Sequence, residues 1–273
     1  MAIQIGCGSW ADPEYAGLLY PPGFPPAMRL SGYAMWFDHI EVNATYYSTP
    51  KRETVEKWVA LTPPGFVFDV RLHRAFSQSP DKTARDGRLL EMLFANLKPI
   101  LRTKKLGTFL LVLSPSFSPE RHRLQELDTL IGKIRPYQLA IELRHAAWVH
   151  GNAKKTTLEF FRERQMTWVA VDMPQLEHST LMPPIDEVTQ PGLAYLRLHG
   201  RNRDYLKADS AKERHTYAYS ESDLQDILKR IHRLSAQAKN VRVVANNHAG
   251  QFAPQTALAL KELLGQTWGK TAP

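Results

Sequence analysis

The sequence has little that would support disulfide-bonded or membrane-embedded structure. Cys7 is the only cysteine among 273 residues, so no internal disulfide can form, and a reducing cytoplasm is the expected location. The longest apolar runs, such as 109–113, are far too short to span a bilayer. The chain enters a β-like segment almost at once, without a basic stretch followed by an apolar one, so we expect no signal peptide and no membrane partner.

Common catalytic and nucleotide-binding motifs are also missing. The sequence has no Gly-x-Ser-x-Gly elbow, no Walker-type loop and no His-Glu-x-x-His zinc motif. Residues 6–11 (Gly-Cys-Gly-Ser-Trp-Ala) formally match a dinucleotide fingerprint, which requires a helix to begin there and hold a pyrophosphate. Asp12-Pro13 and a proline-rich stretch at 20–26 follow instead. We therefore interpret 6–11 as a tight turn at the rim of a barrel.

The charge of the chain is unbalanced toward the basic side. A formal charge of +8 and a pI near 9.5 favour anionic partners, nucleic acid among them. The basic residues are scattered, and the short clusters at 121–123, 154–155 and 201–203 match no nucleic-acid-binding motif. We assign most of them to solvated surface and prefer a small anionic ligand to nucleic acid as the partner.

Eight β-like segments alternate with helical ones along the whole chain. With no linker and no repeat, this order predicts one α/β domain, residues 1–273, folded as a (β/α)8 TIM-type barrel. A doubly wound open sheet is the alternative, but it usually has fewer strands. A loop with four prolines after residue 172 is too long for a simple connector and suggests a lid or an inserted excursion. The expected strands are 3–8, 39–45, 66–73, 108–113, 139–144, 167–172, 195–201 and 241–245. The expected helices are 26–37, 81–102, 156–165, 220–238 and 254–264, together with one that carries Val55, Trp58 and Val59 and one that starts at 118–120.

Ionisable side chains recur on one face of these strands, close to their C-terminal ends. In the strand at 195–201, strict alternation places Tyr195, Arg197 and His199 on one face. The strands at 39–45, 66–73 and 139–144 end in the same way, with charged or amide residues of shared parity. A parallel barrel gathers the C-terminal ends of its strands at one pole, so we expect one polar mouth there.

Motifs spread nearly end to end give the chain a resemblance to the DUF72 family, also called YecE-like. The resemblance implies a TIM-type barrel and no particular activity, because the family is chiefly uncharacterised. Two departures stand out: Arg71 lies where the family tends to have lysine, and Ser77-Gln78 lie where it tends to have Thr-His. A Schiff-base or proton-transfer role for that lysine would not carry over, since arginine stays charged. The matching segments are 5–10 (Ile-Gly-Cys-Gly-Ser-Trp), 17–21 (Gly-Leu-Leu-Tyr-Pro), 41–47 (Glu-Val-Asn-Ala-Thr-Tyr-Tyr), Trp58 before 62–66 (Thr-Pro-Pro-Gly-Phe), 141–145 (Ile-Glu-Leu-Arg-His), 197–201 (Arg-Leu-His-Gly-Arg), 217–220 (Tyr-Ala-Tyr-Ser) and 246–250 (Asn-Asn-His-Ala-Gly).

The residues at the expected mouth favour an enzyme that performs acid/base chemistry on a small polar or anionic substrate. Histidine titrates near neutral pH and carboxylates accept protons, so the catalytic candidates are Glu142, His199, His73 and Asp172. Arginine can clamp a phosphate or carboxylate, and amides and aromatic rings can orient it. The substrate-binding candidates are Glu41, Asn43, Tyr46, Arg71, Arg144, Trp148, Arg197, Arg201, Tyr205, Asn246 and Asn247. Hydrolase, lyase and isomerase chemistry are equally compatible with this set.

Three other interpretations stay open at this stage. The acids and arginines could pair with one another and merely fill the upper barrel, most of all at Glu41 and Asp69, which lie deeper along their strands. The basic, aromatic rim could bind nucleic acid or nucleotides. The chain could also be a metal-dependent phosphoesterase or isomerase with His73, Glu142, Asp172 and His199 as ligands, although three nearby arginines disfavour a divalent cation.

Overall fold

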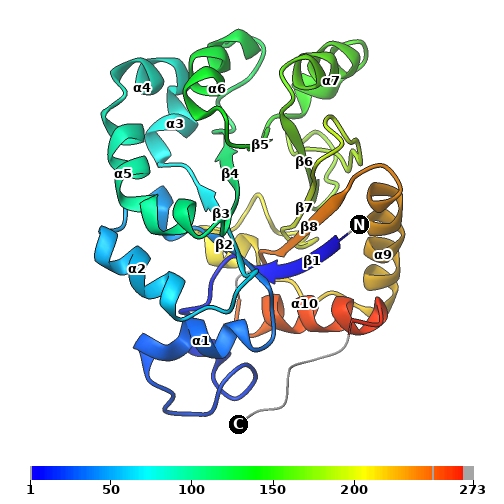
Figure 1. Ribbon diagram of the computed structural model, residues 1–273. Coiled ribbons are helices and arrows are strands. Elements are labelled where there is room, and N and C mark those ends of the chain that lie inside the picture. Colours follow the sequence, from blue (N-terminus) through cyan, green and yellow to red (C-terminus); the bar gives the residue numbers. More distant parts are fainter. Residues whose placement is uncertain (1, 248, 267–273) are drawn as a thin grey trace.

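Eight parallel strands form the centre of the molecule, in the hydrogen-bonded order β1-β8-β7-β6-β5-β4-β3-β2. A computed structural model describes residues 2–247 and 249–266, so His248 of the last matching segment lies outside the described residues. The end strands β1 and β2 lie next to each other, which makes the sheet a nearly closed barrel inside a layer of helices (Figure 1). The predicted (β/α)8 TIM-type barrel is confirmed. Its strands are β1 (Ala2–Cys7), β2 (His39–Val42), β3 (Val67–Arg71), β4 (Leu106–Val112), β5 (Leu139–Glu142), β6 (Thr167–Asp172), β7 (Ala194–Leu198) and β8 (Asn240–Ala245).

A buried tyrosine joins the two end strands. The Cys7 N–H of β1 donates to the Tyr33 hydroxyl at 2.8 Å, and that hydroxyl donates to the His39 carbonyl of β2 at 2.9 Å. The strands approach so closely here that a Cβ on Gly6 would lie 2.4 Å from the His39 carbonyl oxygen. Glycine is therefore required at position 6 by the closure of the barrel, and no α-helix starts in the residues that follow it up to 28.

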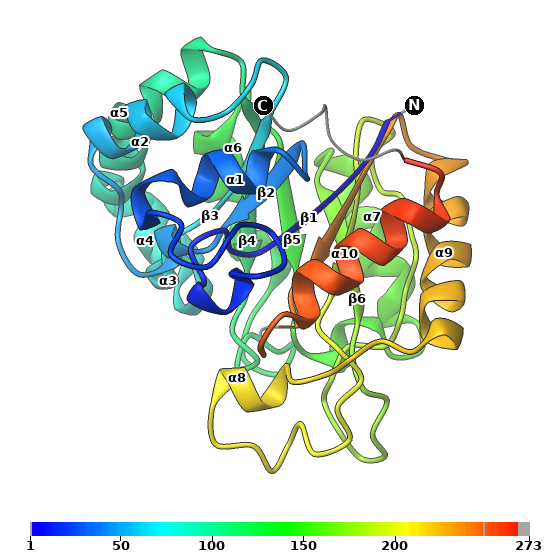
Figure 2. The same cartoon turned by 90° about the horizontal axis from the view of Figure 1, so that it is seen from below.

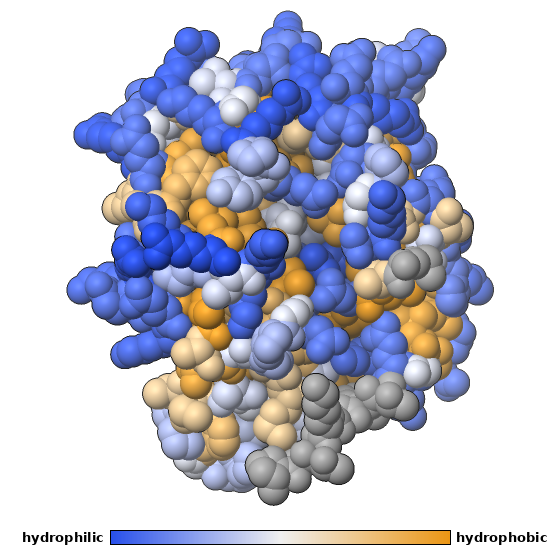
Figure 3. All heavy atoms as spheres, in the orientation of Figure 1, coloured by the Kyte–Doolittle hydropathy of each residue, from blue (hydrophilic) through white to orange (hydrophobic). Residues whose placement is uncertain are grey.

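Helices cover the outside of the barrel through apolar stripes at helical spacing. In α5, Leu90, Leu93, Leu97 and Ile100 are buried against the sheet. Hydrophilic side chains gather at the outer edge over α4, α6 and α7, with apolar ones nearer the middle of that view (Figure 3). The α-helices are α1 (Arg29–Ala34), α2 (Arg52–Ala60), α3 (Arg74–Gln78), α4 (Pro80–Asp86), α5 (Arg88–Arg102), α6 (Asp128–Ile134), α7 (Ala153–Glu163), α8 (Ala211–Arg214), α9 (Glu221–Ser235) and α10 (Phe252–Leu263).

Several element boundaries differ from those expected. The helical region at 81–102 is two helices, because Gly87 adopts a positive φ of 77° between α4 and α5. The helix expected from 118–120 makes only a turn there, and a 3-10 helix (Leu124–Leu127) leads into α6. β2, β3, β5 and β7 end two or three residues early, and after β2 the chain enters a 3-10 helix at Ala44–Tyr46.

The long connection between β6 and β7, residues 173–193, forms neither helix nor strand. Trp168 of β6 binds it twice, since its ring Nε1–H donates to the Ile185 carbonyl at 3.0 Å and its N–H donates to Thr189 Oγ1 at 2.9 Å. The connection therefore covers the outer face of β6, where a (β/α)8 barrel usually carries a helix.

Candidate functional site

A buried arginine organises the polar interior of the barrel. Arg197 of β7 binds both oxygens of Glu41 of β2, with Nε–Oε2 and Nη2–Oε1 distances of 3.0 and 2.7 Å. Its Nη1 reaches Oε2 of Glu142 of β5 at 2.5 Å, and the Tyr195 hydroxyl donates to Glu41 at 3.0 Å. Strand alternation points all four side chains inward, which is the parity that the sequence predicted. Arg197 is 1% exposed and the two acids are not exposed, so each charge requires this pairing.

A second buried cluster lies deeper, toward the N-terminal ends of the strands. Asp69 of β3 contacts His39 Nε2 at 2.7 Å and Arg242 Nε at 3.0 Å, and accepts the Thr108 N–H at 3.0 Å. Arg242 also contacts Gln4 of β1. These groups pair with one another below the Arg197 layer, and only His39 Nδ1 among them lacks a hydrogen-bond partner in the described residues, so Asp69 helps to fill the barrel interior.

His199 sits next to Glu142 at the mouth end of β7. Its Nε2 lies 3.2 and 3.3 Å from the two Glu142 oxygens, and its Nδ1 lies 3.2 Å from the Asn246 amide nitrogen. A neutral imidazole must then carry its proton on Nε2, which donates to the carboxylate, while Nδ1 accepts from Asn246. Burial lowers the pKa of His199 in spite of the neighbouring carboxylate. The ring is therefore neutral at pH 7.

Glu142 stays ionised although it is fully buried. Burial by itself raises the pKa of a carboxyl group, but the charge of Arg197, the hydrogen bond to His199 and the charge of Arg144 outweigh it and hold the pKa of Glu142 well below its usual value. Arg144 Nη1 approaches Glu142 at 3.3 Å, and Arg144 Nη2 donates to the Tyr205 hydroxyl at 2.8 Å. The site therefore couples a neutral imidazole to a fixed anion.

A cavity of about 630 Å³ opens above these groups at the C-terminal ends of the strands. We call it the mouth cavity. Its walls include the loop that carries α8, which projects beyond the strands at this end of the barrel (Figure 2). The polar and aromatic residues that line it are Ser9, Asp12, Asn43, Tyr46, Tyr47, Arg71, Ser77, Gln78, Ser114, Arg144, Arg197, His199, Tyr205, Arg214, His215 and Asn246.

Two cations of the mouth cavity form no ion pair with a described residue, the exposed Arg214 and the partly buried Arg71, and Arg71 is the one that lies beside the buried charges. Its Nη1 donates to Asn43 Oδ1 at 3.1 Å and its guanidinium lies 4.0 Å from the centre of the Tyr46 ring, yet none of the described residues forms an ion pair with it. Its buried Nε has no hydrogen-bond partner among them either, and the same is true of Asn246 Oδ1. Burial and the nearby charge of Arg197 lower the pKa of Arg71 to about 10, so it remains charged at pH 7.

The structure brings most of the predicted site residues together, but five of them lie away from the mouth cavity. The His73 ring accepts the Ala75 N–H at 3.3 Å and caps α3, and the Trp148 ring donates to the Phe117 carbonyl at 2.6 Å. Asn247 donates to the Tyr217 carbonyl at 2.8 Å. Asp172 and Arg201 bind each other in a separate cluster. Asp172 has the opposite parity to Val171 and therefore points outward. Because Asp172 is the last residue of β6, the sequence alone did not reveal this orientation.

The loop after β7 supplies lining residues that the sequence had not singled out. His215 Nδ1 lies 3.0 Å from the His199 carbonyl oxygen, and the two imidazole rings are 5.1 Å apart. Arg214 lines the same cavity. The only sequence signal for His215 and Arg214 is that they lie in the polar loop after β7.

Neither a metal centre nor a membrane span is apparent in residues 2–247 and 249–266. Within these ranges, no group of three His, Cys, Asp or Glu side chains lies close enough to hold a metal ion. The four candidate ligands are split, since Glu142 and His199 touch while His73 and Asp172 lie elsewhere. No helix of the same residues combines the length and apolar character needed to cross a bilayer.

Comparison with known proteins finds full-length relatives. The sequence model described as "Protein of unknown function DUF72" matches residues 4–273. UPF0759 protein YunF of Bacillus subtilis is 26% identical over 99% of this chain and 98% of its own length. Among solved structures, a DUF72 family protein of Enterococcus faecalis is 28% identical with a TM-score of 0.88, covering 99% of this chain and 98% of that one. One from Thermotoga maritima is also 28% identical, with a TM-score of 0.84 and coverages of 97% and 100%.

Proposed function

Because the chain belongs to the DUF72 family, whose description states no function, we propose its function from the mouth cavity itself: it is an enzyme that binds a small anionic substrate and moves a proton with His199. The single observation that carries the proposal is the unneutralised guanidinium of Arg71 in that cavity. Arg71 is partly buried with a buried Nε, and withdrawing a charge from water without a counter-ion costs free energy that an incoming anion would recover in part. Tyr46 and Asn43 hold the guanidinium in place for such a contact.

The charge balance of the inner site supports an anionic ligand. Arg197 pairs with both Glu41 and Glu142, and Arg144 also pairs with Glu142. Arg71 remains as positive charge without a direct counter-ion. A carboxylate or phosphate can accept two parallel hydrogen bonds from one guanidinium, including one from the free Nε–H. The free Asn246 Oδ1 would accept a hydrogen bond from a hydroxyl or amine group of the same ligand.

His199 is the proton-transfer group of the proposal, and Glu142 is its orienting anion. A carboxylate with so low a pKa is a weak base, whereas a neutral imidazole has a lone pair available on Nδ1. Glu142 would stabilise the imidazolium that forms when Nδ1 takes a proton. Because His199 and Asn246 both line the mouth cavity, a ligand bound to Arg71 could approach Nδ1 by displacing the Asn246 amide hydrogen bond.

Ligand binding tests the first half of this proposal. A panel of hydroxy acids and sugar phosphates is screened by thermal shift against the unaltered chain, Arg71→Gln and Arg102→Gln, where Arg102 is an exposed arginine at the end of α5. We expect at least one anion to raise the melting temperature of the unaltered chain and of Arg102→Gln, and Arg71→Gln to lose about tenfold or more in affinity for it. A panel without hits, or a hit that binds Arg71→Gln equally well, would refute the proposal.

Turnover of the bound ligand tests the second half. The anion that binds is incubated with the protein in D2O, and NMR follows its conversion or its uptake of deuterium. Removing a general base typically costs about 10²–10⁴-fold in rate, so His199→Gln should abolish detectable turnover while retaining most of the ligand affinity. A rate unaffected by His199→Gln would assign the chemistry to another group.

A further inference from the structure

The structure contains a second cavity, separate from the mouth cavity, on the outer side of the barrel. It encloses about 500 Å³ between α9 and the 173–193 connection, and shares no lining residue with the mouth cavity. It lies just beyond Asp172, the last residue of β6. One of its walls is the proline-rich 173–193 connection, which occupies the place where a (β/α)8 barrel usually has a helix.

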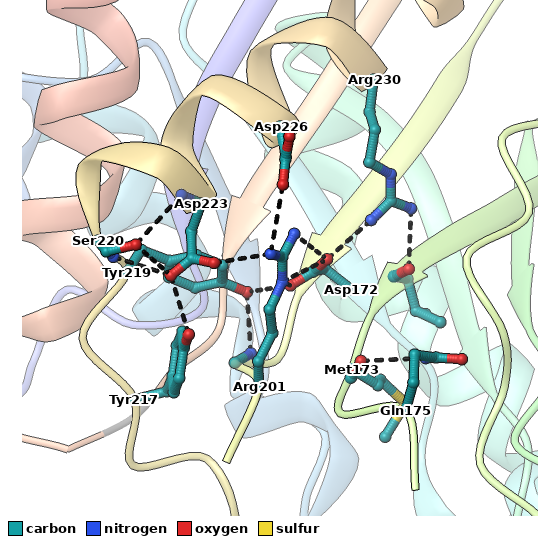
Figure 4. Close-up of polar contacts among 12 residues, drawn as sticks. Asp172, Met173, Gln175, Arg201, Tyr217, Tyr219, Ser220, Asp223, Asp226 and Arg230 are labelled. Atoms are coloured by element: carbon teal, nitrogen blue, oxygen red, sulfur yellow. Dashed lines mark hydrogen bonds and ion pairs between the residues drawn. The ribbon is translucent and has the colours of Figure 1, made fainter. Parts of the chain in front are cut away.

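A braced network of charges forms the floor of this second cavity (Figure 4). Asp172 accepts from Arg201 Nε at 3.0 Å, from Arg230 Nη1 at 3.0 Å and from the Tyr219 hydroxyl at 2.8 Å. Arg201 in turn binds Asp223 at 2.7 Å, and Arg230 binds Asp186 at 2.8 Å. Both guanidinium groups are therefore held in fixed positions before any ligand arrives.

Cations exceed anions around the cavity. The lining includes the cationic residues Arg201, Arg203, Lys229, Arg230 and Arg233, against Asp172, Asp186 and Asp226, and Asp223 behind the lining pairs with Arg201, which leaves a surplus of one positive charge. Three of the cations stand at the exposed rim with donors to spare. No described residue forms an ion pair with Arg203, Lys229 reaches Asp226 only at 3.4 Å, and Arg233 uses one nitrogen on Asp186.

One wall of the cavity is apolar. Met173, Leu176 and Pro184 of the 173–193 connection line it opposite the basic rim. A ligand that matches both sides combines a small apolar body with an anionic group that can accept from several rim cations at once, and a phosphate monoester offers three acceptor oxygens and about 1.5–2 negative charges at pH 7. We propose that the second cavity is a ligand site for the phosphate monoester of a small apolar or aromatic alcohol.

Calorimetric titration with phenyl phosphate tests this site at about 0.15 M ionic strength, where loose surface attraction is screened. We expect saturable binding, and a weakening of about tenfold or more in the double variant Arg203→Ala/Lys229→Ala, which removes two charge-assisted contacts. Both residues are exposed, so folding is not at risk. Benzoate has the same ring with one charge fewer and should bind about tenfold more weakly than phenyl phosphate.

Two further variants make the result specific to this cavity. Lys57→Ala/Arg102→Ala removes the same residue types from exposed positions on α2 and α5, across the barrel from α9 (Figure 1), and should bind phenyl phosphate like the unaltered chain. Arg71→Gln, which disables the mouth cavity, should also retain this binding, so the two proposals fail independently. Absence of phenyl phosphate binding, equal binding by the Arg203→Ala/Lys229→Ala variant, or loss of binding in Arg71→Gln would each overturn the second site.

Discussion

At the scale of single residues, burial decides the protonation of the candidate site. His199 and His39 both lie inside the barrel, each against a carboxylate, and burial lowers the pKa of each below the ordinary 6.5. The carboxylate partners keep their charge because arginines neutralise them. The interior therefore holds two neutral imidazoles that an unfolded chain would protonate in mild acid.

This difference makes folding stability depend on pH, and His199 is the residue to test. Below pH 6.5 the unfolded chain binds a proton at His199 that the folded chain does not, so stability is present above this value and is lost as the pH falls toward the folded pKa. The loss is up to about 1.4 kcal/mol per pH unit. Urea unfolding of the unaltered chain and His199→Gln at pH 7.5 and 5.5 should show a smaller acid-induced loss in the variant, roughly 1 kcal/mol less. Equal losses would mean that His199 is already protonated when folded.

Strand alternation was sufficient to predict which side chains of this site point into the barrel, but not which of them pair with one another. Arg197, His199, Glu142 and Glu41 share the parity that the sequence showed, and the structure places them in contact. Which acid binds which arginine depends on the stagger of strands that lie far apart in sequence, such as β2 and β7. His73 could not be placed from parity, because β3 ends at Arg71 and the chain then turns into α3.

At the scale of elements, single glycines determine where regular structure ends. The apolar periodicity at 81–102 predicted a continuous helical region, and it is correct on both sides of Gly87. The break itself depends on the left-handed backbone of Gly87, whose N–H donates to the Thr83 carbonyl at 3.3 Å and ends α4. Hydrophobic periodicity contains no signal for that conformation, so the two helices appeared as one.

Gly87→Ala tests the importance of this break. A Cβ at Gly87 would be close only to the flexible Lys133 Nζ, at 3.0 Å, with Glu91 Oε1 next at an ordinary 3.5 Å, so the cost comes from the positive φ, about 1–2 kcal/mol of unfolding free energy. The same change at Gly132, inside α6 with open space around a Cβ, should instead stabilise the fold by about 0.4–1 kcal/mol. Chemical denaturation of both variants measures the two effects. A neutral or stabilising Gly87→Ala would show that α4 and α5 can join without strain.

At the scale of the whole molecule, the barrel is closed by a side chain at the seam between β1 and β2. The other strand pairs are joined by backbone hydrogen bonds, and β1 and β2 are the ends of that series. The Tyr33 hydroxyl connects them, accepting from Cys7 on one strand and donating to His39 on the other. Eight alternating segments were enough to predict a barrel, but the seam depends on a hydroxyl from α1 that no strand pattern reveals.

Tyr33→Phe removes only this hydroxyl, so it isolates the contribution of the seam to the whole barrel. The Cys7 N–H and the His39 carbonyl would each lose a partner in a place that water does not reach, and a buried unpaired polar group costs about 1–3 kcal/mol. We expect a lower free energy of unfolding and faster hydrogen exchange at the Cys7 amide. Tyr47→Phe is the matched control, since Tyr47 is 70% exposed and should change neither quantity. Unchanged exchange at Cys7 in Tyr33→Phe would mean that packing alone holds β1 against β2, and that the barrel closes without the tyrosine bridge.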